Sequence, residues 1–199
     1  MSEVQLRIER NQLEVFQDAV RIQQSIITKA EKNVLLWLAA RTPEGINSDH
    51  LTALGSIGMF LAGASYGLCR YTQYGLPLAC LFLAVNWLGD SLDGTLARHR
   101  NRQRPRYGFY VDHVLDCFGV AALLAGMGSS GYMQPIFAAW LLVAYLLVCA
   151  ETFLATYSLG RFKMSYFNFG PTELRVLLCT GNLYLFFQPS VHPFGLSLS

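Results

Sequence analysis

Long apolar runs alternate with short polar segments along most of this chain, and their lengths predict membrane-spanning helices. A helix needs about twenty mostly apolar residues to cross a bilayer. Runs of roughly this length predict five spans, at 51–71, 76–90, 110–128, 135–157 and 172–187. The helical pattern of the second run continues through Arg98, so this helix is expected to project beyond the bilayer. The pattern therefore predicts an all-α, polytopic membrane helix bundle.

The segment before the first predicted span has a different pattern. Apolar residues recur at helical spacing from Leu13 to Val34 among charged and amide residues, which is typical of an amphipathic helix. We prefer a position on the membrane surface, the alternative being a cytosolic helix packed on the rest of the protein. A break at 42–45 then divides the chain into an interfacial or cytosolic segment, 1–46, and a transmembrane domain, 47–199.

The two ends of the chain add two expectations. The first thirty residues carry scattered charges and no continuous apolar segment, so the N-terminus is expected to stay in the cytosol. After the fifth predicted span, Pro189, Pro193 and Gly195 interrupt any helix, and the sequence then stops. A sixth helix is therefore expected to be missing at the C-terminus.

Composition and charge agree with an integral membrane protein. The chain is 53% hydrophobic and 14% charged, whereas roughly a quarter of the residues of a soluble domain are charged. A net charge of +2 is too small to indicate a nucleic-acid partner. Arginines are concentrated between the second and third spans, and Arg161 and Lys163 lie between the fourth and fifth, which predicts that both connections are cytoplasmic. The five cysteines have no metal-ligand spacing and are interpreted as small core residues.

Two pairs of aspartates carry the strongest chemical signal. Asp90 and Asp93 lie near the end of the second span, and Asp112 and Asp116 lie at the start of the third. Residues three or four apart share a helix face, so each pair projects together. The connection between the spans is short, which predicts that the two helices are antiparallel neighbours and that the four carboxylates converge at the cytoplasmic leaflet.

Converging carboxylates repel one another and lose hydration at membrane depth unless cations neutralise them. Hard oxygen ligands of this kind suit Mg²⁺, Mn²⁺ or Ca²⁺, and two such ions can clamp a diphosphate during an in-line displacement. Gly94 and Ala97 leave bare backbone beside the carboxylates, and Arg98 supplies a guanidinium for phosphate oxygens. Each residue alone is more often a helix cap or a packing residue, but their joint spacing favours a binding site.

These residues form the string D-x-x-D-G-x-x-A-R followed by G-x-x-x-D-x-x-x-D, which resembles the signature of the CDP-alcohol phosphotransferase (CDP-alcohol phosphatidyltransferase) family. Every signature position is matched between Asp90 and Asp116. The resemblance implies a six-helix enzyme, usually a homodimer, embedded in membrane lipids and active in phospholipid biosynthesis. Such an enzyme transfers a substituted phosphate group from a CDP-linked lipid or alcohol to a hydroxyl acceptor and releases CMP.

The resemblance also implies residue roles. Two Mg²⁺ or Mn²⁺ ions would be held by Asp90, Asp93, Asp112 and Asp116, and Asp116 would also act as general base for the acceptor hydroxyl. The implied nucleotide site is formed by Asp93, Gly94, Ala97, Arg98, Gly108 and Thr52. The family often has Asn three residues before this Thr, whereas this chain has Asp49, so it departs from the pattern there.

Other polar residues fall in the predicted cytoplasmic leaflet. Glu151, Glu173 and Arg175 are candidates for an acceptor pocket, the alternative being a structural ion pair between Arg175 and one of the glutamates. His113 points about 100° away from the aspartate face and is interpreted as structural. We interpret the basic connections as topology determinants rather than as a site for an anionic acceptor.

Two other functions remain open from the sequence. An intramembrane prenyltransferase also binds a diphosphate through metal and paired aspartates, but such enzymes are larger bundles without counterparts of Gly94, Ala97 and Arg98. A small ion-coupled transporter would place its carboxylates near the midplane of the membrane, whereas here they are predicted at one surface.

Overall fold

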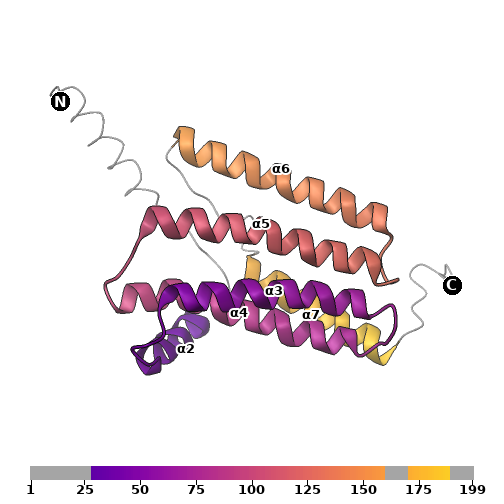
Figure 1. Ribbon diagram of the computed structural model, residues 1–199, viewed down its shortest axis with the longest axis horizontal. Helices are drawn as coiled ribbons and strands as arrows, with labels where there is room; N and C mark the ends of the chain where they lie inside the picture. Colours follow the sequence, from indigo (N-terminus) through magenta and orange to yellow (C-terminus); the bar gives the residue numbers. More distant parts are fainter. Residues whose placement is uncertain (1–27, 160–169, 189–199) are drawn as a thin grey trace.

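The computed structural model describes residues 28–159 and 170–188, and this part of the chain is helical, without strands. Its helices are α2 (Thr28–Arg41), α3 (Ser48–Leu68), α4 (Gly75–His99), α5 (Pro105–Ser129), α6 (Pro135–Leu159) and α7 (Pro171–Phe187). Figure 1 shows an elongated bundle in which α3 to α6 run along the long axis. The prediction of an all-α helix bundle is confirmed. The amphipathic pattern that begins at Leu13 lies mostly outside the described residues.

Four helices, α3 to α6, are long and apolar enough to cross a membrane. The fifth predicted span is present as the helix α7, but α7 has 17 residues and is not among these four. Helix α4 continues to His99, as its sequence predicted. Helix α5 begins at Pro105 rather than at 110, because proline suits the first turn of a helix, where its missing N–H is not needed.

Helix α3 is the centre of the bundle. It packs against both α4 and α5, whereas α4 and α5 make few contacts with each other. The prediction that α4 and α5 are direct neighbours is therefore wrong, although their connection is short and they run in opposite directions as predicted (Figure 1). The reason lies in the glycines of α3, which allow close approach on two sides. A Cβ atom on Gly89 of α4 would lie 2.5 Å from the Gly55 nitrogen, and one on Gly63 would lie 2.5 Å from the Ala122 carbonyl oxygen of α5.

Helices α2 and α7 cover other sides of α4. Helix α2 lies at the end of the bundle where α4 leads into α5, and α7 lies alongside α4 (Figure 1). Leu35 and Ala39 of α2 join a buried cluster with Leu51, Leu92 and Leu96. Arg100 then fixes the connection between α2 and α3, since its guanidinium donates hydrogen bonds to the carbonyl oxygens of Thr42, Pro43 and Ile46.

Helix α6 lies at the outside of the bundle and contacts α5 (Figure 1). Many of its large apolar side chains are exposed, among them Trp140 and Leu147 at 66% each, as expected of a helix that faces lipid. The five cysteines are free and only partly buried, so their interpretation as core residues is confirmed only in part.

Candidate active site

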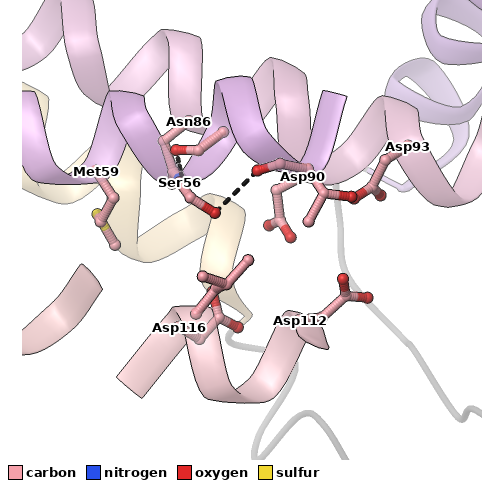
Figure 2. A pocket seen from close by; sticks show the side chains of 10 residues that line it. Ser56, Met59, Asn86, Asp90, Asp93, Asp112 and Asp116 are labelled. Atoms are coloured by element: carbon pink, nitrogen blue, oxygen red, sulfur yellow. Dashed lines mark hydrogen bonds between the residues drawn. The ribbon is translucent and has the colours of Figure 1, made fainter. Parts of the chain in front are cut away.

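A pocket with an empty volume of about 310 Å³ lies between α4 and α5 over the N-terminal half of α3. Its walls carry all four motif aspartates together with polar residues of α3 and α4. The lining residues are Thr52, Gly55, Ser56, Met59, Asn86, Asp90, Asp93, Asp112, Leu115 and Asp116. Figure 2 shows the aspartates of α4 on one side of the pocket and those of α5 on the other. The separation of α4 from α5 by α3 creates this space.

Asp93 is the most buried of the four aspartates, with 6% of its surface exposed. The hydroxyl of Thr52 donates a hydrogen bond of 2.6 Å to its Oδ2, and the backbone N–H of Gly94 donates to its Oδ1. The hydroxyl of Ser48 also donates to the Asp93 carbonyl oxygen at 2.9 Å. Because the donors on α3 are fixed by the helix packing, they give this carboxylate one orientation. Thr52 was predicted as a nucleotide contact, and its observed partner is Asp93.

Asp90 is held by a side chain of α7 that lies 85 residues further along the chain. The guanidinium of Arg175 on α7 forms an ion pair of 2.8 Å with its Oδ2. The Nε of Arg175 also donates to the side-chain oxygen of Asn86 at 2.9 Å, and the Asn86 amide donates to the Gly55 carbonyl at 3.0 Å. One continuous set of hydrogen bonds therefore joins α7, α4 and α3 beside the pocket.

The ion pair differs from the sequence-based alternative, which joined Arg175 to a glutamate. Glu173 instead accepts a hydrogen bond of 3.0 Å from the backbone N–H of Gly170 and so caps the start of α7. Glu151 is exposed on α6. Neither glutamate lines the pocket. Sequence reasoning missed the partner of Arg175, since no local spacing links it to Asp90.

Asp112 and Asp116 are both partly buried on α5 and face the α4 pair. Because α5 begins at Pro105, Asp116 lies near the middle of this 25-residue helix rather than at its start. His113 lies outside the pocket lining, and its ring contacts those of Phe109 and Phe153 at centroid distances of 4.2 and 5.2 Å. This packing agrees with its structural interpretation.

The other predicted nucleotide residues lie on α4 and α5 outside the pocket lining. Arg98 is exposed, and its guanidinium donates to the Thr95 hydroxyl at 3.2 Å. It also covers Gly94, where an added Cβ would lie 3.4 Å from Nη1. Gly108 has open space at its Cα. Ala97 is partly buried on the turn before Arg98.

The donor chemistry of the pocket fits a hard divalent cation. Carboxylate and hydroxyl oxygens are the ligands that Mg²⁺ and Mn²⁺ prefer. Across residues 28–159 and 170–188, however, no three His, Cys, Asp or Glu side chains are close enough to hold one ion. Two of the four carboxylates are turned toward protein donors, Asp90 toward Arg175 and Asp93 toward Thr52. A metal would therefore require these side chains to reorient.

Four apolar helices and a carboxylate-lined pocket within the bundle define an integral membrane protein with a polar internal site. The family model for CDP-alcohol phosphatidyltransferase matches residues 48–199, and the chain belongs to this family. Members transfer phosphatidyl groups from a CDP-alcohol to a hydroxyl acceptor, so the chain is a membrane transferase of phospholipid biosynthesis. No curated protein matched the chain.

Proposed function

We propose that this protein catalyses metal-dependent transfer of a substituted phosphate group from a CDP-linked lipid or alcohol to a hydroxyl acceptor, with release of CMP. The observation that carries the proposal is the meeting of Asp90, Asp93, Asp112 and Asp116 at one pocket. This pocket lies within the part of the chain that the family model matches.

The four carboxylates are proposed to hold two Mg²⁺ or Mn²⁺ ions. When bound there, such ions would supply positive charge to the diphosphate of the donor and to the departing CMP. The chain itself supplies the orientation of the ligands. Thr52 and the Gly94 N–H hold the Asp93 carboxylate at the pocket wall, and Ser48 fixes the backbone at the same residue. These contacts fix the position of Asp93 beside the pocket, and its carboxylate would still have to turn from Thr52 toward a bound cation.

Asp116 is proposed to act as the general base. It lines the pocket opposite Asp90, and in the described residues its carboxylate accepts no hydrogen bond from another side chain or from the backbone. The carboxylate is therefore available to accept the proton of an acceptor hydroxyl within about 3 Å. Proton removal at that hydroxyl oxygen makes it a better nucleophile toward the phosphorus atom of the donor.

The cytidine nucleotide is proposed to bind at the end of the pocket where the α4–α5 connection begins. Gly94, Ala97 and Gly108 provide little side-chain bulk there, and the exposed Arg98 guanidinium, which donates to Thr95, is proposed to contact phosphate oxygens. The Thr52 hydroxyl already donates to Asp93, so a contact between Thr52 and the nucleotide would have to form beside this hydrogen bond. The acceptor pocket proposed for Glu151, Glu173 and Arg175 is supported only at Arg175, which lies beside Asp90.

The active site and the N-terminus are proposed to face the cytoplasm. The support is the series of arginines at 98, 100, 102, 104 and 106, which follows the aspartates of α4 and favours a cytoplasmic position for this end of the bundle. A homodimer and contacts with membrane lipids belong to the same proposal. The division at residue 46 is proposed as the boundary between the interfacial segment and the transmembrane domain.

The test is a screen of donors against acceptors with purified protein. CDP-linked lipids and CDP-linked alcohols are each incubated with glycerol phosphate, inositol phosphate, serine or diacylglycerol, and CMP is measured. We expect CMP release for at least one pair in the presence of Mg²⁺ or Mn²⁺, and none when a chelator is added. Absence of CMP over the full panel, from protein shown to be monodisperse, would contradict the proposal.

A further inference from the structure

Arg175 lies in an unusual position for a cation beside a carboxylate pocket. Its side chain is 13% exposed, whereas that of Asp90 is 38% exposed. Among the residues that the structure describes, the guanidinium donates to two partners, the Asp90 carboxylate and the Asn86 side-chain oxygen, and both belong to α4. A mostly buried guanidinium that lost these partners would lose much of its charge compensation. The ion pair therefore compensates the charge of both side chains, the Arg175 guanidinium and the Asp90 carboxylate.

A second set of contacts holds α7 in the place where this ion pair forms. Oε1 of Glu31 on α2 accepts a hydrogen bond of 2.8 Å from the indole N–H of Trp87 and one of 3.2 Å from the hydroxyl of Thr172. Trp87 lies one turn before Asp90 on α4, and Thr172 lies one turn before Arg175 on α7. Glu31 thus joins the same two helices that the ion pair joins, and it does so from a third helix.

We propose that Arg175 is a built-in counter-cation of Asp90, which a divalent metal must displace or tolerate, and that Glu31 is a positioning residue that keeps Arg175 there. This inference rests on the proposed function only in taking Asp90 as a metal ligand. Two cations cannot share one carboxylate without repelling each other, and this repulsion is large in a partly buried site. The metal affinity of the pocket is therefore set in part by α7 and, through Glu31, by α2.

The proposal predicts that metal affinity rises when the contacts of Arg175 are removed. A structural defect at this position would not raise metal affinity. Removing the positive charge by Arg175→Gln is expected to lower the dissociation constant for Mn²⁺ by at least about fivefold. Arg175→Lys keeps the charge and should remain near the wild-type value. Glu31→Gln weakens the hydrogen bonds that Glu31 accepts from Trp87 and Thr172, and Glu31 does not line the pocket. This variant should therefore also lower the dissociation constant for Mn²⁺, by a smaller factor.

The experiment is a titration of purified full-length protein with Mn²⁺, followed by electron paramagnetic resonance of the free ion. Arg70→Gln is the matched control, because Arg70 is an exposed arginine just after α3, at the end of that helix away from Thr52. It removes the same charge and should leave the constant unchanged. Lys32→Gln, an exposed neighbour of Glu31, is the control for α2.

A second measurement examines the ion pair without metal. In the presence of a chelator, Arg175→Gln should lower the melting temperature when it is introduced into the wild-type chain. The same substitution should have a much smaller effect on the melting temperature when it is introduced into the Asp90→Asn variant. Equal effects in the two backgrounds would overturn the pairing. If the wild type binds Mn²⁺ and Arg175→Gln binds it no more tightly, the counter-cation role is overturned while the proposed function stands. A wild type that binds no Mn²⁺ would overturn both.

Discussion

The aspartates of α4 and those of α5 line one pocket, but their carboxylates have different surroundings. On α4, Asp93 accepts hydrogen bonds from Thr52 and Gly94, and Asp90 is paired with Arg175. On α5, Asp116 accepts no hydrogen bond from any residue in 28–159 or 170–188, although it faces the same space (Figure 2). One side of the pocket therefore has its charges oriented by the protein, and the other side offers a carboxylate for the reacting molecule.

The difference follows from the neighbours of the two helices. Helix α4 contacts α2, α3 and α7, and donors from α3 and α7 reach its aspartates. Helix α5 packs on α3 and on α6, and α6 is an apolar helix whose side chains are largely exposed. Of these two helices, the one with more packing neighbours thus carries the fixed carboxylates.

Asp116→Asn gives the strongest test of this contrast, and we expect the rate of CMP release to fall about 10²- to 10⁴-fold. This is the usual contribution of a general base. The amide has nearly the same size, so nucleotide binding should persist. The measurement is CMP release under saturating donor, together with equilibrium binding of a CDP-linked donor. If the variant keeps more than a tenth of the wild-type rate, Asp116 is not the base.

Gly89→Ala is expected to disturb the α4 side and to leave α5 in place. The added Cβ would lie 2.5 Å from the Gly55 nitrogen, with backbone rather than a flexible side chain in its way. Overpacking of this kind costs about 1–3 kcal/mol in folding free energy. Thermal unfolding in detergent should show a lower melting temperature, with lower activity.

Gly181→Ala is the control for this substitution. Gly181 is exposed on α7 and has open space at its Cα, so alanine should be neutral or slightly stabilising there. If both variants melt at the wild-type temperature, the close approach of α3 and α4 does not fix the α4 aspartates.

The sequence predicted much of this arrangement because its signals are local. Runs of apolar residues located the helices, and spacings of three and four placed Asp90 with Asp93 and Asp112 with Asp116. The neighbours of each helix could not be predicted in this way. A short connection suggested that α4 and α5 are adjacent, yet the glycines of α3 allow it to pack against both and so hold them apart.

The partner of Asp90 was equally hidden, because Arg175 is 85 residues away in the chain and no pattern in either segment refers to the other. The start of α5 was placed too late, since the exposed Arg106 and Tyr107 after Pro105 continue the helix without adding to its apolar run. The first of these misses depends on tertiary packing, and the second arose because the apolar run alone was used to place the start of the helix.

Thr52→Val tests how much the orientation of the α4 pair contributes. The valine keeps the shape of the side chain but removes the hydroxyl that donates to Asp93 at 2.6 Å. A hydrogen bond to a charged group is worth about 1.5–3 kcal/mol, so we expect CMP release to fall roughly tenfold or more. Thr52→Ser keeps the donor and should retain most of the activity. Equal losses in both variants would point to packing at this position rather than to the hydrogen bond.

The smallest effect is expected from Asp49→Asn, which breaks the ion pair between the start of α3 and Arg104 just before α5. Both side chains are 53% exposed, and exposed pairs contribute less than about 1 kcal/mol. The melting temperature and the rate of CMP release should therefore stay close to wild type, also at high salt. A large loss of activity without a change in stability would show that the position of α5, and with it Asp116, depends on this surface contact. In that case α3 would position both sides of the pocket. It would hold α4 through buried packing and α5 through the ion pair between Asp49 and Arg104.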